Sequence, residues 1–224
     1  MIELYLDTAD IEQVARFNLC LPLRGVTTNP SILAGSATGL SKLLPALAAE
    51  LGPAARFHAQ VVSTTVEGMV EEAKQINQLP YDMVVKVAAT ETGLAAIKQI
   101  KKEGILVLAT AIYSAQQGFL AALCGADYLA PYVNRIDAMG ADGVGVVADL
   151  QHLINQHGLT SKILAASFKN TQQAMDVMKL GIAAITLPVD VAHQMFAHPA
   201  VQPAVDKFSK DWQSAFADKL SFES

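Results

Sequence analysis

The alternation of short apolar runs with longer amphipathic stretches constrains this chain more than any other feature of its sequence. The runs have the length and the β-branched composition of buried strands. Several are apolar on both faces, as the strands of a parallel sheet must be when helices cover both sides. We predict strands at residues 2–6, 25–28, 56–61, 83–87, 105–109, 128–131, 162–166 and 184–188.

The segments between these runs have the periodicity of helices. They include residues 39–51, 65–77, 91–102, 114–124, 145–157, 171–180 and 189–196. Strands that alternate with helices in this number favour a closed parallel (β/α)₈ barrel over an open doubly wound sheet. The chain has 224 residues, of which 52% are hydrophobic, and no linker or low-complexity segment divides it. We therefore predict a single α/β barrel domain over residues 1–224.

One more helix is predicted after the last strand–helix unit, at about residues 200–218. An apolar stripe at helical spacing runs along it, formed by Val201, Val205, Phe208, Trp212 and Phe216. Such a stripe usually packs on its own domain, and the alternative is a helix that docks on a neighbouring subunit.

Charge and composition exclude several classes of function. A net charge of −5 argues against a nucleic-acid or an anionic-membrane surface. No apolar run approaches the roughly 18 residues of a membrane span, and the N-terminus has no signal-peptide pattern. Cys20 and Cys124 are typical of reduced packing residues, and the spacing of His152 and His157 does not suit metal ligands. We expect a soluble, cytoplasmic protein without metal.

Polar residues gather where the predicted strands end. They are Asp7, Thr27, Thr28, Asn29, Gln60, Lys86, Thr110, Tyr132, Asn134, Arg135, Ser167 and Lys169. In a barrel of this type the carboxyl ends of the strands share one rim, and that rim carries the chemistry. The sequence therefore predicts a functional site at this end of the barrel.

Lys86 is the most unusual of these residues, because it stands between Val85 and Val87 in an apolar strand. Lysines are rarely buried without a reason. Burial disfavours the ammonium form and lowers the pKa from its usual value of about 10.4. A neutral amine near pH 7 is what addition to a carbonyl requires. The alternative is a structural ion pair with Asp7 or Glu67.

Imine chemistry also needs a group that moves protons. Tyr132, Gln60 and Thr110 could hold a water beside an imine, and Tyr132 is the one of the three that titrates. Each also has a purely structural interpretation. Tyr132 could be a core aromatic, Gln60 an amide whose hydrogen bonds are made within the strand, and Thr110 a residue that merely ends a strand. Asp7 could likewise cap the first helix, and Asn29 before a proline is a natural turn residue.

Arg135 and Ser167 together could bind a phosphate, because a guanidinium fork matches phosphate oxygens. Phosphate sites near the last strands are common in these barrels. The alternative for Arg135 is an ion pair with Asp137 or Asp127.

Several longer strings carry a family resemblance. They are YLDTAD, GVTTNPSI, AQVVSTT, VVKVAAT, APYVNRIDAMGADG, LAASFKN and ITLPVDV. Together they resemble the small transaldolase-like family of class I aldolases, most closely its fructose-6-phosphate aldolase subgroup. The resemblance runs from residue 2 to about residue 216, and TTNPS and PYVNRID are its most specific parts. It implies a (β/α)₈ barrel and aldol chemistry with neither metal nor cofactor.

The resemblance also implies a role for each candidate residue. Lys86 would form the Schiff base, and Tyr132 would act as acid and base through a water held by Gln60 and Thr110. Asp7 and Asn29 would bind hydroxyls of the donor, and Arg135 and Ser167 would bind the phosphate of the acceptor. Thr27 would be a further substrate-binding position. Small members of the family form decamers of two pentamers, with the C-terminal helix reaching a neighbour. This favours a homo-oligomer and, for the stripe at residues 200–218, docking on a neighbouring subunit.

The family contains two activities. Its transaldolases typically carry glutamate at the position of Gln60 and phenylalanine at that of Tyr132, so this chain has the aldolase pair. We expect a carbon–carbon lyase that joins dihydroxyacetone or hydroxyacetone to glyceraldehyde 3-phosphate, forming or cleaving fructose 6-phosphate. The alternative is a transaldolase. Rival interpretations are a phosphate-binding isomerase that uses Lys86 only electrostatically and a barrel without enzymatic activity.

Overall fold

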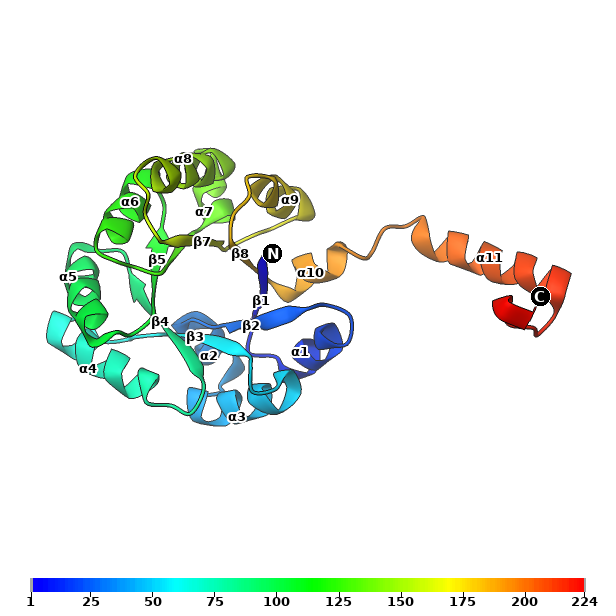
Figure 1. Ribbon diagram of the computed structural model, residues 1–224, viewed down its shortest axis with the longest axis horizontal. Coiled ribbons are helices and arrows are strands. Elements are labelled where there is room, and N and C mark those ends of the chain that lie inside the picture. Colours follow the sequence, from blue (N-terminus) through cyan, green and yellow to red (C-terminus); the bar gives the residue numbers. More distant parts are fainter. Residues whose placement is uncertain (1, 224) are drawn as a thin grey trace.

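The computed structural model describes residues 2–223 and shows a closed barrel of parallel strands surrounded by helices (Figure 1). Each strand pairs with its neighbours in sequence, and β8 pairs with β1 to close the ring. The strands are β1 (Glu3–Asp7), β2 (Leu23–Thr27), β3 (Arg56–Gln60), β4 (Asp82–Ala88), β5 (Val107–Ile112), β6 (Tyr128–Pro131), β7 (Lys162–Ala165) and β8 (Ala184–Leu187).

Helices form the outer layer, except for the last one, which extends away from the barrel (Figure 1), and short 3₁₀ turns lie at Lys101–Glu103 and Ser221–Glu223. They are α1 (Ile11–Asn18), α2 (Pro30–Ser36), α3 (Leu40–Leu51), α4 (Val66–Asn77), α5 (Glu91–Ile100), α6 (Ala115–Leu123), α7 (Val133–Ala138), α8 (Gly143–Gln156), α9 (Thr171–Lys179), α10 (Val189–Gln194) and α11 (Val201–Phe216). Among the described residues no single helix is long and apolar enough to cross a membrane; α2 and α3 meet that test only as a pair bent by 91°.

Side-chain caps fix where most of these helices begin. The N-cap side chains that accept a hydrogen bond from the first turn are Asp10, Asn29, Thr65, Thr90, Ser114, Asp142 and Asn170. Each satisfies a backbone N–H that would otherwise lack a partner. Because most of these caps follow closely after a strand, they also hold the loops at the carboxyl ends of the strands, where the candidate site lies.

Strand alternation divides the core into two layers. Val85 and Val87 pack in the outer layer, between the strands and the helices. Lys86 lies between them in β4, so its side chain points into the barrel. The inner layer is small and is built from Tyr5, Val84, Leu108, Tyr128, Ala130, Leu164, Ala166 and Ala184.

A polar network closes the amino-terminal end of the barrel. Tyr5 and Tyr128 both donate to the carboxylate of Glu3, at 2.6 and 2.9 Å. Lys162 Nζ donates to the same carboxylate at 3.0 Å, and Arg56 Nη1 donates to Tyr128 Oη at 2.7 Å. This end of the barrel is therefore filled by side chains that bind one another.

The predicted (β/α)₈ barrel and the additional C-terminal helix are confirmed. The strand predicted at 105–109 is wrong at both ends, because β5 runs through a bulge to Ile112. The helix predicted from residue 145 begins at Gly143, where Asp142 caps it. Helices α2 and α7 were not among the predicted elements.

Of the two interpretations of the C-terminal stripe, packing on its own domain is wrong. Helix α11 extends away from the barrel (Figure 1). The stripe residues Val201, Val205, Phe208 and Phe216 are exposed, and Trp212 is half-buried. Phe208 is 67% exposed and Val201 is 51% exposed. The intersubunit alternative is therefore the one that stays open.

Candidate active site

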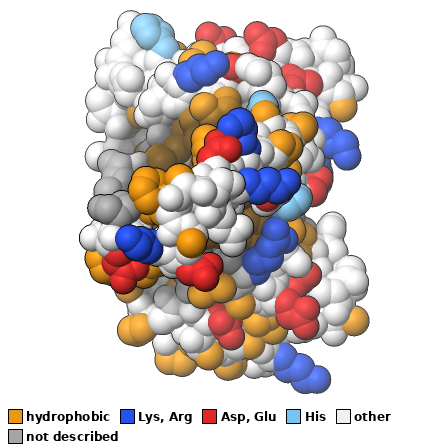
Figure 2. Space-filling model, turned by 90° about the vertical axis from the view of Figure 1, so that its right-hand side faces the viewer, with side chains coloured by type: hydrophobic (Ala, Val, Ile, Leu, Met, Phe, Trp, Pro, Cys, Tyr) orange, Lys and Arg blue, Asp and Glu red, His pale blue; other side chains and the backbone are white. Residues whose placement is uncertain are grey.

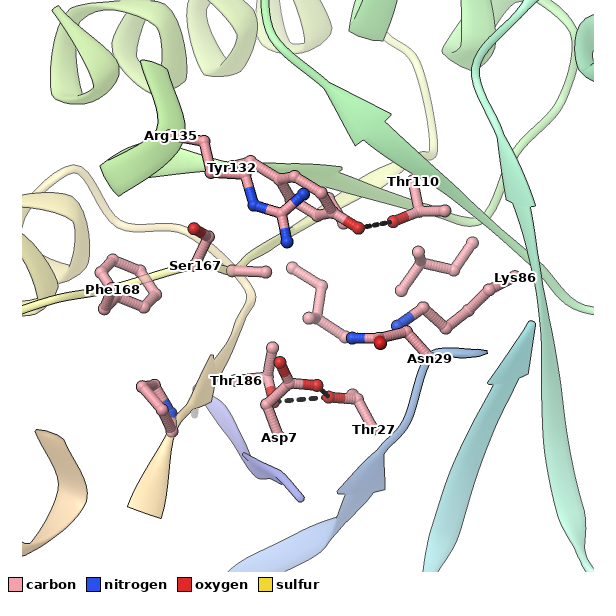
Figure 3. Close-up of a pocket in the computed structure, with 15 residues that line it drawn as sticks. Asp7, Thr27, Asn29, Lys86, Thr110, Tyr132, Arg135, Ser167, Phe168 and Thr186 are labelled. Atoms are coloured by element: carbon pink, nitrogen blue, oxygen red, sulfur yellow. Dashed lines mark hydrogen bonds between the residues drawn. The ribbon is translucent and has the colours of Figure 1, made fainter. Parts of the chain in front are cut away.

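A cavity of about 150 Å³ opens at the carboxyl ends of the strands (Figure 3). Strands β1, β2 and β4 to β8 contribute to it, whereas none of its lining residues comes from β3. Among its lining residues are Asp7, Thr27, Asn29, Lys86, Thr110, Tyr132, Arg135 and Ser167. The residues to which the resemblance gives a role thus meet in one cavity, with the exception of Gln60, as the shared rim of a parallel barrel requires. The other polar residues of the predicted rim, Thr28, Asn134 and Lys169, do not line it.

Lys86 lies at the wall of this cavity and is 5% exposed. Its Nζ donates to the backbone oxygen of Thr28 at 2.5 Å. Within residues 2–223 no ion pair joins it to Asp7 or Glu67, so the structural alternative fails. Burial lowers the pKa of Lys86, and the negative charge of Asp7 offsets this only in part. The amine is therefore closer to its neutral, nucleophilic form than an exposed lysine.

Tyr132 follows β6 and faces Lys86 across the cavity (Figure 3). Its hydroxyl shares a 2.8 Å hydrogen bond with Thr110 Oγ1, which β5 supplies. Burial raises the pKa of Tyr132, against the opposing effects of this hydrogen bond and of the Arg135 guanidinium. The phenol therefore carries its proton near neutral pH and can donate it to a ligand.

A chain of hydroxyls fixes Asp7. Thr27 Oγ1 donates to Asp7 Oδ1 at 2.7 Å and lies 2.7 Å from Thr186 Oγ1. The helix-cap alternative for Asp7 is wrong, because Asp10 caps α1. Thr186 was not among the predicted site residues, although the alternation of β8 gives its inward direction. The hydrogen bond from Thr27 thus fixes one carboxylate oxygen of Asp7 at the cavity.

Asn29 serves two purposes. Its Oδ1 accepts from the Ile32 N–H at 3.0 Å and so caps α2, as expected of a turn residue before proline. Its side chain also lines the cavity (Figure 3). With the oxygen engaged in the cap, the NH₂ group is what Asn29 can offer to a ligand.

Arg135 and Ser167 lie together on the same side of the cavity mouth (Figure 3). The guanidinium carbon of Arg135 stands 4.7 Å from the centre of the Tyr132 ring. Ser167 has a left-handed backbone with φ of 61°, a strained conformation for a residue other than glycine. A cation, a hydroxyl and a strained turn at a cavity mouth form a corner that suits an anion.

The ion-pair alternatives for Arg135 are wrong. Asp127 pairs with Lys101 at 2.6 Å. Asp137 accepts from the Gly143 N–H at 2.7 Å and from Gln173 Nε2 at 2.6 Å. Arg135 Nη1 instead donates to Tyr113 Oη at 3.4 Å, and Tyr113 was not predicted as part of the site.

Gln60 was predicted to lie with the other site residues, but it does not line this cavity. It lies in register with Lys86 on the neighbouring strand, so its side chain leaves the same face of the sheet. It lines an adjacent, wider hollow together with Ser63, Thr64 and Thr90. A single water held jointly by Gln60 and Thr110 therefore stays a prediction.

Apolar residues complete the cavity wall. Phe168 and Pro188 lie beside Ser167 and Thr186, and the sequence pointed to neither because neither carries a reactive group. Among the described residues, no cluster of three or more His, Cys, Asp and Glu side chains could hold a metal ion. The arrangement therefore places the amine of Lys86, the phenol of Tyr132 and the cation of Arg135 around one small cavity.

Comparisons with known proteins give a family match and several similar folds. The sequence model for "Transaldolase/Fructose-6-phosphate aldolase" matches residues 4–223. Similar solved structures include a candidate isomerase from Sinorhizobium meliloti in an open-loop conformation, with 10% identity, a TM-score of 0.63 and coverage of 85% of this chain and 52% of that one. A double variant of flavocytochrome b2 with sulfite bound has 11% identity, a TM-score of 0.62 and coverage of 92% and 61%.

A third solved structure, described as native KDPGal, has 13% identity and a TM-score of 0.55 and covers 83% of this chain and 81% of its own. The present chain spans only about half to three fifths of the first two proteins. At these identities the likeness shows the barrel fold alone.

Proposed function

This chain belongs to the transaldolase/fructose-6-phosphate aldolase family, and from that premise we propose that it is a Schiff-base aldolase. It joins dihydroxyacetone or hydroxyacetone to glyceraldehyde 3-phosphate, and it cleaves fructose 6-phosphate in the reverse direction. The observation that carries the proposal is the buried amine of Lys86, free of any carboxylate ion pair within residues 2–223, in one cavity with the protonated phenol of Tyr132.

In the synthetic direction, neutral Lys86 attacks the carbonyl carbon of the ketone. The resulting carbinolamine loses water and gives an iminium ion, which withdraws electrons from the neighbouring carbon. That carbon releases a proton and becomes the nucleophilic end of an enamine. The enamine attacks the aldehyde carbon, and the new alkoxide takes up a proton. Water then hydrolyses the iminium, which releases the product and restores the amine.

The remaining residues divide the substrate between them. Tyr132, hydrogen-bonded to Thr110, donates its proton to the carbinolamine hydroxyl as that group leaves as water. The phenolate so formed takes the proton from the neighbouring carbon and then gives it to the new alkoxide, directly or through a water. Asp7, Thr27 and Asn29 lie where they can bind the hydroxyls of the donor. The positive charge at the mouth supports a phosphorylated acceptor, since Arg135 and Ser167 border the same cavity.

Covalent trapping tests this function. Borohydride reduction in the presence of dihydroxyacetone should add one donor mass to the intact protein, and the adduct should map to the peptide that contains Lys86. The Lys86→Met variant should give no adduct, while Lys162→Met, at the opposite end of the barrel, should still give one. A reduced adduct on another lysine, or full activity without any adduct, would overturn the proposal.

A transaldolase is the second candidate, because the family description covers both activities. Both enzymes pass through the same enamine, but only the aldolase protonates it and releases free dihydroxyacetone. A phenol at position 132 supports that protonation, whereas a phenyl ring could not supply the proton. The wild-type enzyme should therefore release dihydroxyacetone from fructose 6-phosphate and transfer it poorly to erythrose 4-phosphate.

Product partitioning with and without erythrose 4-phosphate measures this choice. The double variant Gln60→Glu, Tyr132→Phe should shift the ratio toward transfer. Faster formation of sedoheptulose 7-phosphate than of free dihydroxyacetone by the wild type would identify a transaldolase instead.

We also propose that the enzyme is a homo-oligomer, with a decamer of two pentamers as the expected assembly. The exposed stripe of α11 supports this, as does an apolar hollow of about 390 Å³ on the outer wall, lined in part by Ile2, Met178 and Phe196. Figure 2 looks from the side of α11 and shows hydrophobic side chains at the surface among charged ones. Light scattering should give an oligomer for the wild type and a smaller species for Phe208→Asp.

A further inference from the structure

Strand β5 is distorted immediately after Thr110. The backbone of Ala111 has φ of 56°, in the left-handed region that favours glycine. At the same place the pairing of β5 with β6 shifts between Ala109 and Ile112. A bulge with a strained residue is a costly feature, and such features gather where a side chain must be redirected.

The bulge changes which side chain faces the site. Leu108 lies in the inner layer, so strict alternation would also send residues 110 and 112 into the barrel. Thr110 does line the cavity, but Ile112 is fully buried in the outer layer. The alternation has slipped by one residue, and the following residue, Tyr113, turns toward the site instead.

Tyr113 makes contacts with two residues of the candidate site. Its ring meets the ring of Tyr132 edge-on, with centres 5.7 Å apart and planes at 70°. Its hydroxyl accepts a hydrogen bond from Arg135 Nη1 at 3.4 Å. Its own N–H donates to Gln117 Oε1 at 3.0 Å, which anchors its backbone to the start of α6.

These contacts form a closed triangle. The Arg135 guanidinium lies over the Tyr132 ring at 4.7 Å, and Tyr113 touches both partners. Arg135 is an exposed, flexible side chain, and it would lose much rotamer freedom if substrate alone had to fix it. The hydrogen bond from Arg135 to Tyr113 restricts the guanidinium before substrate binds, and so reduces the entropy that binding costs.

We propose that Tyr113 is a positioning residue that holds the Arg135 guanidinium over the Tyr132 ring and thereby sets the distance from the phosphate of the acceptor to the acid/base phenol. This inference rests on the proposed function, because it takes Arg135 as the phosphate-binding group. It makes Tyr113 a determinant of specificity for phosphorylated acceptors, although Tyr113 itself touches no substrate.

The test compares two acceptors in the Tyr113→Phe variant, which keeps the ring and removes the hydroxyl. The ratio of kcat/KM for glyceraldehyde 3-phosphate to kcat/KM for glyceraldehyde should fall about 2- to 10-fold, the range of one hydrogen bond, mainly through KM of the phosphorylated acceptor. Tyr81→Phe is the matched control, since Tyr81 packs on Phe57 in the outer layer, and it should leave the ratio as it is. An unchanged ratio in Tyr113→Phe would overturn the inference.

A double variant shows whether Tyr113 acts through Arg135. In an Arg135→Ala background, Tyr113→Phe should cause no further fall in the ratio, because the group that it positions is gone. An equal fall with and without Arg135 would also overturn the inference, since Tyr113 would then act by another route.

Binding of glycerol 3-phosphate, which cannot undergo the aldol reaction, separates this inference from the proposed function. Calorimetry should show weaker binding to Tyr113→Phe and to Arg135→Ala, with no added loss in the double variant and equal thermal unfolding for Tyr113→Phe and wild type. If borohydride trapped no adduct on Lys86 but this pattern held, the proposed chemistry would fail and the role of Tyr113 would stand. If an adduct formed on Lys86 but Tyr113→Phe bound glycerol 3-phosphate as the wild type does, the chemistry would stand and the role of Tyr113 would fail.

Discussion

The two ends of the barrel interior carry the same kinds of residue but differ in how their hydrogen-bonding groups are used. The carboxyl end has Lys86, Arg135, Asp7 and Tyr132, and the amino end has Lys162, Arg56, Glu3 and Tyr128. At the amino end these groups bind one another within 3.0 Å. At the carboxyl end they surround a cavity. Residue type alone therefore does not identify an active site. An active site is identified by polar groups that remain available to bind a ligand.

The protonation of the two ends differs in the same way. Burial, together with the hydrogen bond to Glu3, raises the pKa of both Tyr5 and Tyr128. Burial alone would raise the pKa of Glu3, but the hydrogen bonds from Tyr5, Lys162 and Tyr128 outweigh it and lower that pKa. The amino end is thus held in one charge state near neutral pH, whereas the buried amine of Lys86 is shifted toward neutrality.

The largest difference should appear between the two lysines. Lys86→Met should lower kcat by at least about 1,000-fold, because the covalent intermediate cannot form. It should leave stability equal or higher, since a buried amine is replaced by an apolar side chain. Lys162→Met should keep full kcat and lower the free energy of unfolding by about 0–1 kcal/mol, because this half-exposed ion pair is screened by solvent. Comparable loss of activity in both variants would break the comparison.

The two arginines give the next effect. Arg135→Ala should lower kcat/KM for glyceraldehyde 3-phosphate about 10- to 150-fold more than for glyceraldehyde, the range of a charged hydrogen bond. Arg56→Ala should lower stability but leave this acceptor preference unchanged, because Arg56 binds Asp82 and Tyr128 at the other end. Steady-state kinetics with both acceptors measures the difference, and equal losses on both in Arg135→Ala would assign Arg135 to the fold.

The two carboxylates should separate stability from binding. Glu3→Gln should lower the free energy of unfolding by about 1–3 kcal/mol, because it removes the charge that Tyr5, Tyr128 and Lys162 share. Urea denaturation measures this change, and kcat should stay at the wild-type value. Asp7→Asn, at the cavity, should instead raise KM for the donor with little loss of stability. A stable Glu3→Gln variant with altered kinetics would contradict the distinction.

The smallest effect concerns His58, which is 1% exposed and lies between the two ends, edge-on to the rings of Tyr5 and Tyr128. Within residues 2–223 neither ring nitrogen has a hydrogen-bond partner. Burial lowers its pKa well below 6.5, and the positive charges of Lys86 and Arg56 add to the shift. The folded protein therefore keeps His58 neutral, while the unfolded chain takes up a proton as the pH falls below about 6.5.

Stability should consequently be lost as the pH falls below about 6.5. Between pH 7 and pH 5.5 the wild type should lose about 1 kcal/mol more than His58→Phe, as measured by urea denaturation at both values. Equal losses in the two proteins would mean that a partner such as a buried water satisfies the imidazole.

The barrel was predictable because its signals are local. Strand and helix periods differ, and each is written within a few residues, so the order of elements follows from the sequence. The period of the strand also gives the inward direction of Lys86 between two valines. Caps such as Asp10 and Thr65 could likewise be anticipated from their residue types.

The sequence by itself determined the ring of strands and the meeting of polar residues at one rim, because parallel strands of a closed barrel must end together. Only the tertiary structure decided which neighbours those residues meet. The bulge at Ala111 turned Tyr113 toward Arg135, Gln60 lines a second hollow and not the cavity beside Lys86, and α11 extends away from the barrel (Figure 1). These outcomes depend on contacts between segments far apart in sequence, and no local period records them.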